Sequence, residues 1–209
     1  MVALTNDMAW RAMRAAVPDR MIFVGVDLGK LENYSAVVVV ERIEEVPTNY
    51  LDILRGAGVK IRYVVRHAER LALETPYIEV VKRVKQVVGQ MATRGNCVLV
   101  VDETGVGVPV VEEMRRARMG CAIYPVMISS GQQATGKSVP REELLTRMKM
   151  MIERGELEIT TGCLHGVWLK RELVYLRLNG SSSKGGGKGG EKDDLALALA
   201  LACWKARVR

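Results

Sequence analysis

The chain has 209 residues, 48% of them hydrophobic and 26% charged, which suits one globular domain with a sizeable core. Its net charge of +7 indicates an anionic partner, such as nucleic acid, a nucleotide or a membrane surface. Only two histidines occur, which excludes a His-rich zinc site, and four dispersed cysteines indicate reduced thiols in a cytosolic protein. Because no run combines transmembrane length with an absence of charge, we expect no membrane segment.

The predicted elements alternate in type along the chain. Residues 6–17 can form a linker or docking helix, so we divide the chain into residues 1–19 and a domain over residues 20–209. Apolar runs predict five main strands, at residues 21–26, 34–40, 60–67, 96–101 and 121–128, with a short edge strand at 157–160. Periodicity and capping signals predict helices that begin near residues 76, 110, 140, 164 and 193.

This order of elements predicts an α/β fold. Three strands joined by short connections form an antiparallel meander, and the later strands join it through right-handed crossovers. The result is a mixed five-stranded sheet with helices on both faces, which is the ribonuclease H-like arrangement. In that arrangement the first and fourth strands lie side by side and parallel.

The last predicted helix opens with Asp193 and Asp194 and continues almost wholly in leucine and alanine. Both residue types favour helix, and a helix that is apolar on every side must be buried. One interpretation makes the two aspartates simple caps, stabilised by the helix dipole. The other is that a buried helix carries carboxylates to a metal site.

Two further aspartates stand at predicted strand ends. Asp27 follows the first strand and Asp102 the fourth, and open α/β sheets place their sites at such carboxyl ends. Asp27 could instead be a turn residue before Gly29, and Asp102 a cap for the next helix. Taken with the acids of the last helix, they predict a site for two Mg²⁺ or Mn²⁺ ions, which would stabilise the attacking and leaving oxygens of a phosphodiester displacement.

Four motifs, in this order, give the chain a resemblance to a known family. They are residues 25–29 (GVDLG), 66–71 (RHAERL) with 75–77 (TPY), 101–107 (VDETGVG) and 193–200 (DDLALALA). From about residue 20 to its end the chain resembles the nuclease domain of the large terminase subunit of tailed phages, which cuts concatemeric DNA during packaging. The resemblance implies a two-metal endonuclease acting on double-stranded DNA with Asp27, Asp102 and Asp194 as catalytic residues. Asp193 would be a further metal ligand and Glu103 a possible substitute for Asp102.

The resemblance also implies partners and a location. Terminase large subunits carry an N-terminal ATPase motor, so this chain is either an excised domain or a stand-alone nuclease homologue. A separate motor, a portal or a small terminase subunit would then be its partner, in the cytoplasm of the host cell if the chain is phage-encoded. Two rivals stay open: a Holliday-junction resolvase, and a DNA-binding or assembly module without catalysis.

Residues 131–138 (GQQATGKS) match the phosphate-loop pattern of nucleotide-binding proteins and follow a predicted strand. Such a loop needs its lysine and serine in the first turn of a helix, whereas Pro140 disfavours helical geometry at Val139. We therefore expect a polar loop rather than an NTPase site. Basic residues near the predicted site would contact the DNA backbone, two of them in the glycine-rich loop at 180–190: Lys30, Lys137, Arg141, Lys184 and Lys188.

Overall fold

The computed structural model describes residues 19–29, 33–45, 47, 58–131, 136, 138–179 and 193–207. The helix expected over residues 6–17 and the glycine-rich loop at 180–190 lie outside these residues.

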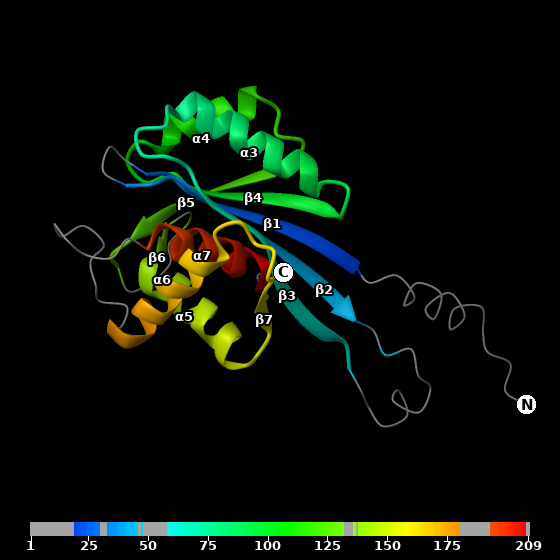
Figure 1. The fold of residues 1–209 in the computed structure, drawn as a ribbon. Coiled ribbons are helices and arrows are strands. Elements are labelled where there is room, and N and C mark those ends of the chain that lie inside the picture. Colours follow the sequence, from blue (N-terminus) through cyan, green and yellow to red (C-terminus); the bar gives the residue numbers. More distant parts are fainter. Residues whose placement is uncertain are drawn as a thin grey trace, which may run out of the picture.

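Seven strands form a single sheet in the order β6-β5-β4-β1-β2-β3-β7 (Figure 1). The strands β1 (Asp19–Asp27), β2 (Ala36–Glu45) and β3 (Lys60–Arg70) form an antiparallel meander. On the other side of β1, the strand β4 (Asn96–Asp102) pairs with it in parallel, and β5 (Ala122–Ser129) pairs in parallel with β4. The predicted five-stranded ribonuclease H-like sheet is therefore confirmed as the centre of this fold.

Two three-residue strands extend the sheet beyond those five. The strand β7 (Leu157–Ile159) pairs in parallel with β3 and is the edge strand that the sequence predicted. The strand β6 (Ser138–Pro140) pairs in parallel with β5 at the opposite edge and was not predicted. Its three residues follow a polar segment and are too few to produce an alternating pattern, so only pairing with β5 defines them as a strand.

Helices cover both faces of the sheet. The helices α3 (Tyr77–Met91) and α4 (Gly107–Arg116) lie on one face, and α5 (Arg141–Glu153), α6 (Gly166–Asn179) and α7 (Asp194–Arg207) lie on the other (Figure 1). No helix of the described residues is long and apolar enough to cross a bilayer. Because side chains alternate along a strand, each helical layer packs on its own set of strand residues, and two separate cores result.

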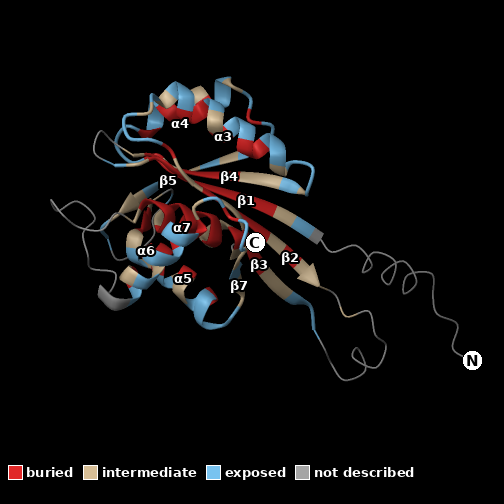
Figure 2. Cartoon of the chain, viewed as in Figure 1, coloured by how far each residue is buried: buried red, intermediate tan, exposed pale blue. Residues whose placement is uncertain are grey.

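The helix α7 lies at the centre of its layer and is buried along almost its whole length (Figure 2). It packs on β1 and β2, and Gly25 of β1 makes this approach possible. A Cβ atom at Gly25 would lie 2.0 Å from the carbonyl oxygen of Ala198 and 2.9 Å from the amide nitrogen of Ala202. The glycine of the first motif and the alanines of the last are thus two halves of one contact, which sets where α7 begins.

Candidate active site

Asp27 and Asp102 occupy neighbouring ends of two parallel strands. Val26 pairs with Val101 in the register of β1 and β4, so the two aspartates that follow lie level with each other. Strands in a sheet are roughly 4.8 Å apart, which brings the two carboxylates within reach of a common ligand. Alternation places both side chains on the α7 face, because Phe23 and Val100, which are in step with them, belong to the core beneath α7.

The start of α7 adds two more carboxylates to this edge. Asp194 is the first helical residue, and Asp193 precedes it, with its carbonyl oxygen accepting the amide hydrogen of Leu197 at 2.9 Å. The side chain of Asp194 is buried at 7% exposure, whereas that of Asp193 is more open. The two aspartates can therefore stabilise the start of α7 and also act on Asp27, so the capping interpretation and the metal-site interpretation are compatible.

The electrostatics of Asp27 reveal how the four acids converge. Its residue exposure is 9%, and burial is the largest cause that raises the pKa of its carboxyl well above the ordinary value. The negative charges of Asp102, Asp194 and Asp193 raise this pKa further, in that order, while Arg141 lowers it. Ionising a buried carboxylate among three others is unfavourable, because the charge loses its hydration and is repelled by its neighbours. A bound cation would offset both costs.

Two of the surrounding acids are held by neighbouring groups. The Oδ1 atom of Asp102 accepts hydrogen bonds from the amide of Thr104, at 2.9 Å, and from its hydroxyl. The Thr104 hydroxyl also accepts the amide hydrogen of Ile128 at 2.9 Å, which ties the end of β4 to β5. Asp193 forms an ion pair with Arg141 at the start of α5. Asp102 and Asp193 are thus oriented by the fold before any ligand binds.

A fifth acid, Glu172 of α6, was not predicted to lie near the site. Its side chain is 2% exposed, accepts the amide hydrogen of Ala196 at 2.8 Å and pairs with Arg70 of β3. Burial raises the pKa of Glu172 to about 8, although the Ala196 amide and Arg70 act to lower it. Glu172 caps α7 from a neighbouring helix, and no local pattern in the sequence signals such a contact.

The other predicted site residues are less tightly grouped. Glu103 is buried beside Gly107 at the start of α4, and its amide donates a hydrogen bond of 2.9 Å to Val126. Arg141, predicted to contact DNA, lies next to the carboxylates through its ion pair with Asp193. The other predicted DNA contacts, Lys30, Lys137, Lys184 and Lys188, lie outside the described residues.

The donor set suits a hard divalent cation, because carboxylate oxygens are the preferred protein ligands of Mg²⁺ and Mn²⁺. Within the described parts of the chain, however, no three His, Cys, Asp or Glu side chains are close enough to form a ready metal site. In this arrangement Asp102 is hydrogen-bonded to Thr104, and Asp193 is paired with Arg141. The residues therefore fit a metal by their chemistry and shared charge, and binding would draw the side chains inward.

The serine that ends the phosphate-loop pattern, Ser138, does not have the position that a nucleotide site requires. Ser138 begins the strand β6, where it pairs with Met127, and the following helix starts only at Arg141. A phosphate loop needs this serine in the first turn of a helix. The expectation that Pro140 delays the helix is confirmed.

No family model matches the sequence, and no curated protein sequence matches it. Among solved structures, the large terminase nuclease of the thermophilic phage G20c, solved with bound zinc, is 21% identical over 88% of this chain and 80% of its own, with a TM-score of 0.52. The nuclease domain of the large terminase subunit gp2 of bacterial virus Sf6, solved with manganese and β-thujaplicinol, is 13% identical over 92% of both chains, with a TM-score of 0.49. RuvC of Thermus thermophilus is 15% identical over 89% of this chain and 96% of its own, with a TM-score of 0.38.

The likeness to the G20c nuclease shows that this chain has the fold of a ribonuclease H-like nuclease. The family resemblance predicted from the four motifs is thereby confirmed at the level of the fold.

Proposed function

We propose that this protein is a metal-dependent endonuclease that hydrolyses phosphodiester bonds of double-stranded DNA. The observation that carries the proposal is the grouping of acids around Asp27, which lies beside Asp102 at the ends of two parallel strands and near the start of α7. Burial raises the pKa of Asp27, and the charges of Asp102, Asp194 and Asp193 raise it further. A structural acid would be neutralised by a neighbouring cation, whereas among the described residues the charges that act on Asp27 are three carboxylates against Arg141. The likeness of the fold to that of a large terminase nuclease supports a nuclease function.

In this proposal Asp27, Asp102 and Asp194 hold the metal and Asp193 supports them. Two bound divalent ions would stabilise the charge that develops on the attacking and leaving oxygens. Asp194 is assigned ahead of Asp193 because it is the more buried and raises the pKa of Asp27 more. Arg141 orients Asp193 and reduces the repulsion at Asp27, so it prepares the site for an anionic substrate.

A role in phage DNA packaging is a further part of the proposal. It is supported by the likeness to the large terminase nuclease of phage G20c and by the motifs shared with that family. A separate ATPase motor, a portal or a small terminase subunit would then be the partner, and the host cytoplasm the place of action. The net charge of +7 favours association with DNA despite the acidic centre.

The test is a cleavage assay on supercoiled plasmid, linear duplex and a four-way junction, with Mg²⁺, with Mn²⁺ and with EDTA. We expect plasmid and linear duplex to be cut only when metal is present. Asp193→Asn should lower the cleavage rate by about 10- to 100-fold, the range expected for a residue that supports metal ligands. Asp194→Asn should lower it further. Melting curves of both variants serve as the control for folding.

Each alternative predicts a different result in the same assay. A plasmid left intact across a titration of both metals would contradict the proposal and favour a DNA-binding or assembly module. Cleavage confined to the four-way junction would favour a resolvase. Equal activity of Asp194→Asn and the wild type would overturn the assignment of residues.

A further inference from the structure

A pocket lies on the same edge of the sheet as the carboxylates. It has a volume of about 300 Å³ and is lined by Tyr34, Arg70, Leu71, Ala72, His165 and Trp168. These residues come from the segment before β2, the end of β3 and the start of α6. None of them belongs to the set assigned above to metal binding.

The strand register fixes how far this pocket is from Asp27. Asp27 pairs with Ala36 of β2, and Ala36 pairs with Arg70 of β3, so the three residues form one row across the sheet. Two strand spacings separate Asp27 from Arg70, roughly 10 Å. Residues that pair directly point to the same face, which is the face of α7. The pocket and the carboxylates therefore open on the same side of the same edge.

The walls of the pocket are aromatic and basic. The guanidinium of Arg70 lies 5.1 Å from the centre of the Tyr34 ring, and that of Arg171 lies 5.8 Å from the Trp168 ring. Trp168 is 51% exposed, although a tryptophan gains most when it is covered. Stacking rings joined to guanidinium groups are what proteins use to bind the bases and backbone of unpaired strands.

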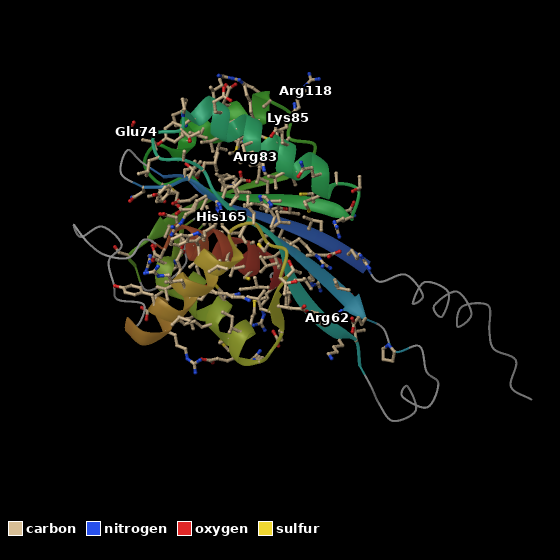
Figure 3. The ribbon with its side chains drawn as sticks, viewed as in Figure 1. Arg62, Glu74, Arg83, Lys85, Arg118 and His165 are labelled. Atoms are coloured by element: carbon tan, nitrogen blue, oxygen red, sulfur yellow. The ribbon has the colours of Figure 1, made fainter. Side chains whose placement is uncertain are left out.

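The pocket is joined to the acidic site through buried hydrogen bonds. Arg70 pairs with Glu172, and Glu172 accepts the Ala196 amide hydrogen near the start of α7. On its other side, the Arg70 amide donates to Nδ1 of His165 at 2.8 Å, and the His165 amide donates to Ala68 at 3.0 Å. His165, labelled in Figure 3, lies close to the sheet on the side of α6 and α7. The position of the pocket relative to Asp27 is therefore fixed by the fold.

We propose that this pocket binds one unpaired nucleobase of the DNA strand, next to the phosphate that is cut. This inference rests on the proposed nuclease function and deepens it: the double-stranded DNA that is cut would present one unpaired or extruded nucleotide beside the cleavage point. A base inside an intact duplex is stacked on both faces and cannot enter a pocket. An unpaired base stacks on Trp168 and Tyr34. The phosphates of the adjoining backbone then lie near Arg70 and Arg171.

The test measures binding in EDTA, so that no strand is cut, with 2-aminopurine as a fluorescent base. The probes are a single strand, a duplex with one bulged 2-aminopurine, a fully paired duplex and the free 2-aminopurine deoxynucleoside monophosphate. We expect the wild type to quench the 2-aminopurine fluorescence of the single strand and of the bulged duplex, because the base stacks on the protein. Trp168→Ala should weaken their binding by roughly 5- to 150-fold, the range for one stacked base. Trp168→Phe should retain most of the affinity.

The matched control is Val167→Ala, which removes an exposed apolar side chain from the adjacent position of α6 and should leave all binding unchanged. Binding of the paired duplex should be the same in wild type and Trp168→Ala. Because Trp168 is half exposed, its variants should fold, and melting curves check this. Free monophosphate should bind far more weakly than the strand, since it lacks the adjoining backbone contacts; equal affinity would overturn the assignment to a DNA strand.

Two further results would overturn the inference. One is that Trp168→Ala has no effect on the binding of any probe, and the other is that it weakens binding of the paired duplex as much as binding of the unpaired probes. Failure of the nuclease proposal looks different, because it appears in the metal-dependent cleavage assay. If the wild type binds the bulged base through Trp168 but cuts no DNA, the nuclease proposal is overturned and the proposal of a base-binding pocket stands. Wild type that cuts DNA while Trp168→Ala binds every probe normally would overturn the pocket alone.

Discussion

Glu41 and Asp27 are buried carboxylates on neighbouring strands of one sheet, and their surroundings carry opposite charge. The Glu41 side chain is 0% exposed and forms ion pairs with Arg20 at 3.3 Å and Arg66 at 2.5 Å. Asp27 instead faces the charges of Asp102, Asp194 and Asp193, with Arg141 as the cation that acts against them. Within the part of the chain that the structure describes, the first acid is surrounded by cations and the second mainly by other acids.

We propose that this difference separates a structural acid, Glu41, from a functional one, Asp27. Burying a charge raises the free energy of the folded state unless an opposite charge lies beside it. A buried acid without such a partner in the protein therefore indicates that a bound ligand supplies the opposite charge. At Glu41 two arginines provide the compensation. At Asp27 a divalent cation would provide it, which is why we assign the chemistry to that end of the sheet. The predictions below test this distinction, from the largest expected effect to the smallest.

Neutral substitutions at the two acids should have opposite effects. Asp27→Asn should reduce the cleavage rate by more than the 10- to 100-fold loss typical of residues that support metal ligands. At pH 8 it should also raise the melting temperature, because it removes the repulsion between Asp27 and the neighbouring carboxylates. Glu41→Gln should cost roughly 1–3 kcal/mol, since it leaves two arginines without their carboxylate. Thermal melts in EDTA and plasmid cleavage measure both effects. A destabilised Asp27→Asn would contradict the comparison.

Gly25→Ala should separate the position of the acids from their charge. The added Cβ atom would meet backbone atoms of Ala198 and Ala202 at 2.0 and 2.9 Å, so α7 must shift. We expect a loss of about 2 kcal/mol or more together with a loss of cleavage, although no acid is removed. The control is Gly89→Ala in α3, where no atom lies within 4 Å and stability should rise by up to about 1 kcal/mol. Normal melting of Gly25→Ala would refute the close packing of α7 on β1.

Added Mn²⁺ should stabilise the protein through Asp27 and Asp102. A ligand at a hundred times its Kd adds about 2.7 kcal/mol to the free energy of unfolding when it binds only the folded state. We expect a higher melting temperature at millimolar Mn²⁺ in the wild type and in Glu41→Gln. The Asp27→Asn, Asp102→Asn double variant should show no shift. A double variant that responds as strongly as the wild type would place the metal elsewhere.

The last prediction concerns stability without any change in cleavage: Glu172 should make the free energy of unfolding depend on pH. Its pKa is raised to about 8, against roughly 4.3 for an unfolded chain, so between these values the folded state holds a proton that the unfolded state has released. Stability contributed by this group is lost as the pH rises through that window. In EDTA, the melting temperature of Glu172→Gln should therefore fall less between pH 5 and pH 8 than that of the wild type. The exposed Glu158→Gln should follow the wild type, and identical slopes for Glu172→Gln and wild type would refute the prediction.

The sequence alone was sufficient to predict the central sheet and where four acids stand in it, whereas their role as a site stays a prediction. Apolar runs marked β1 to β5, and Asp27 and Asp102 stand directly at the ends of two of them. The leucine and alanine content of residues 195–202 identified a buried helix with Asp193 and Asp194 at its start. These features are local, because strand alternation and helix preference depend on nearby residues.

Other features were decided only by the tertiary structure. The strand β6 exists because Ser138 to Pro140 pair with β5, and Glu172 reaches Ala196 from a different helix. The pairing of Arg70 with Ala36 brings the aromatic pocket into the row of Asp27. Each of these contacts joins residues distant in the chain or lacking a local pattern. Such contacts form only when whole elements pack, because the energy that selects them comes from burial and charge shared between those elements.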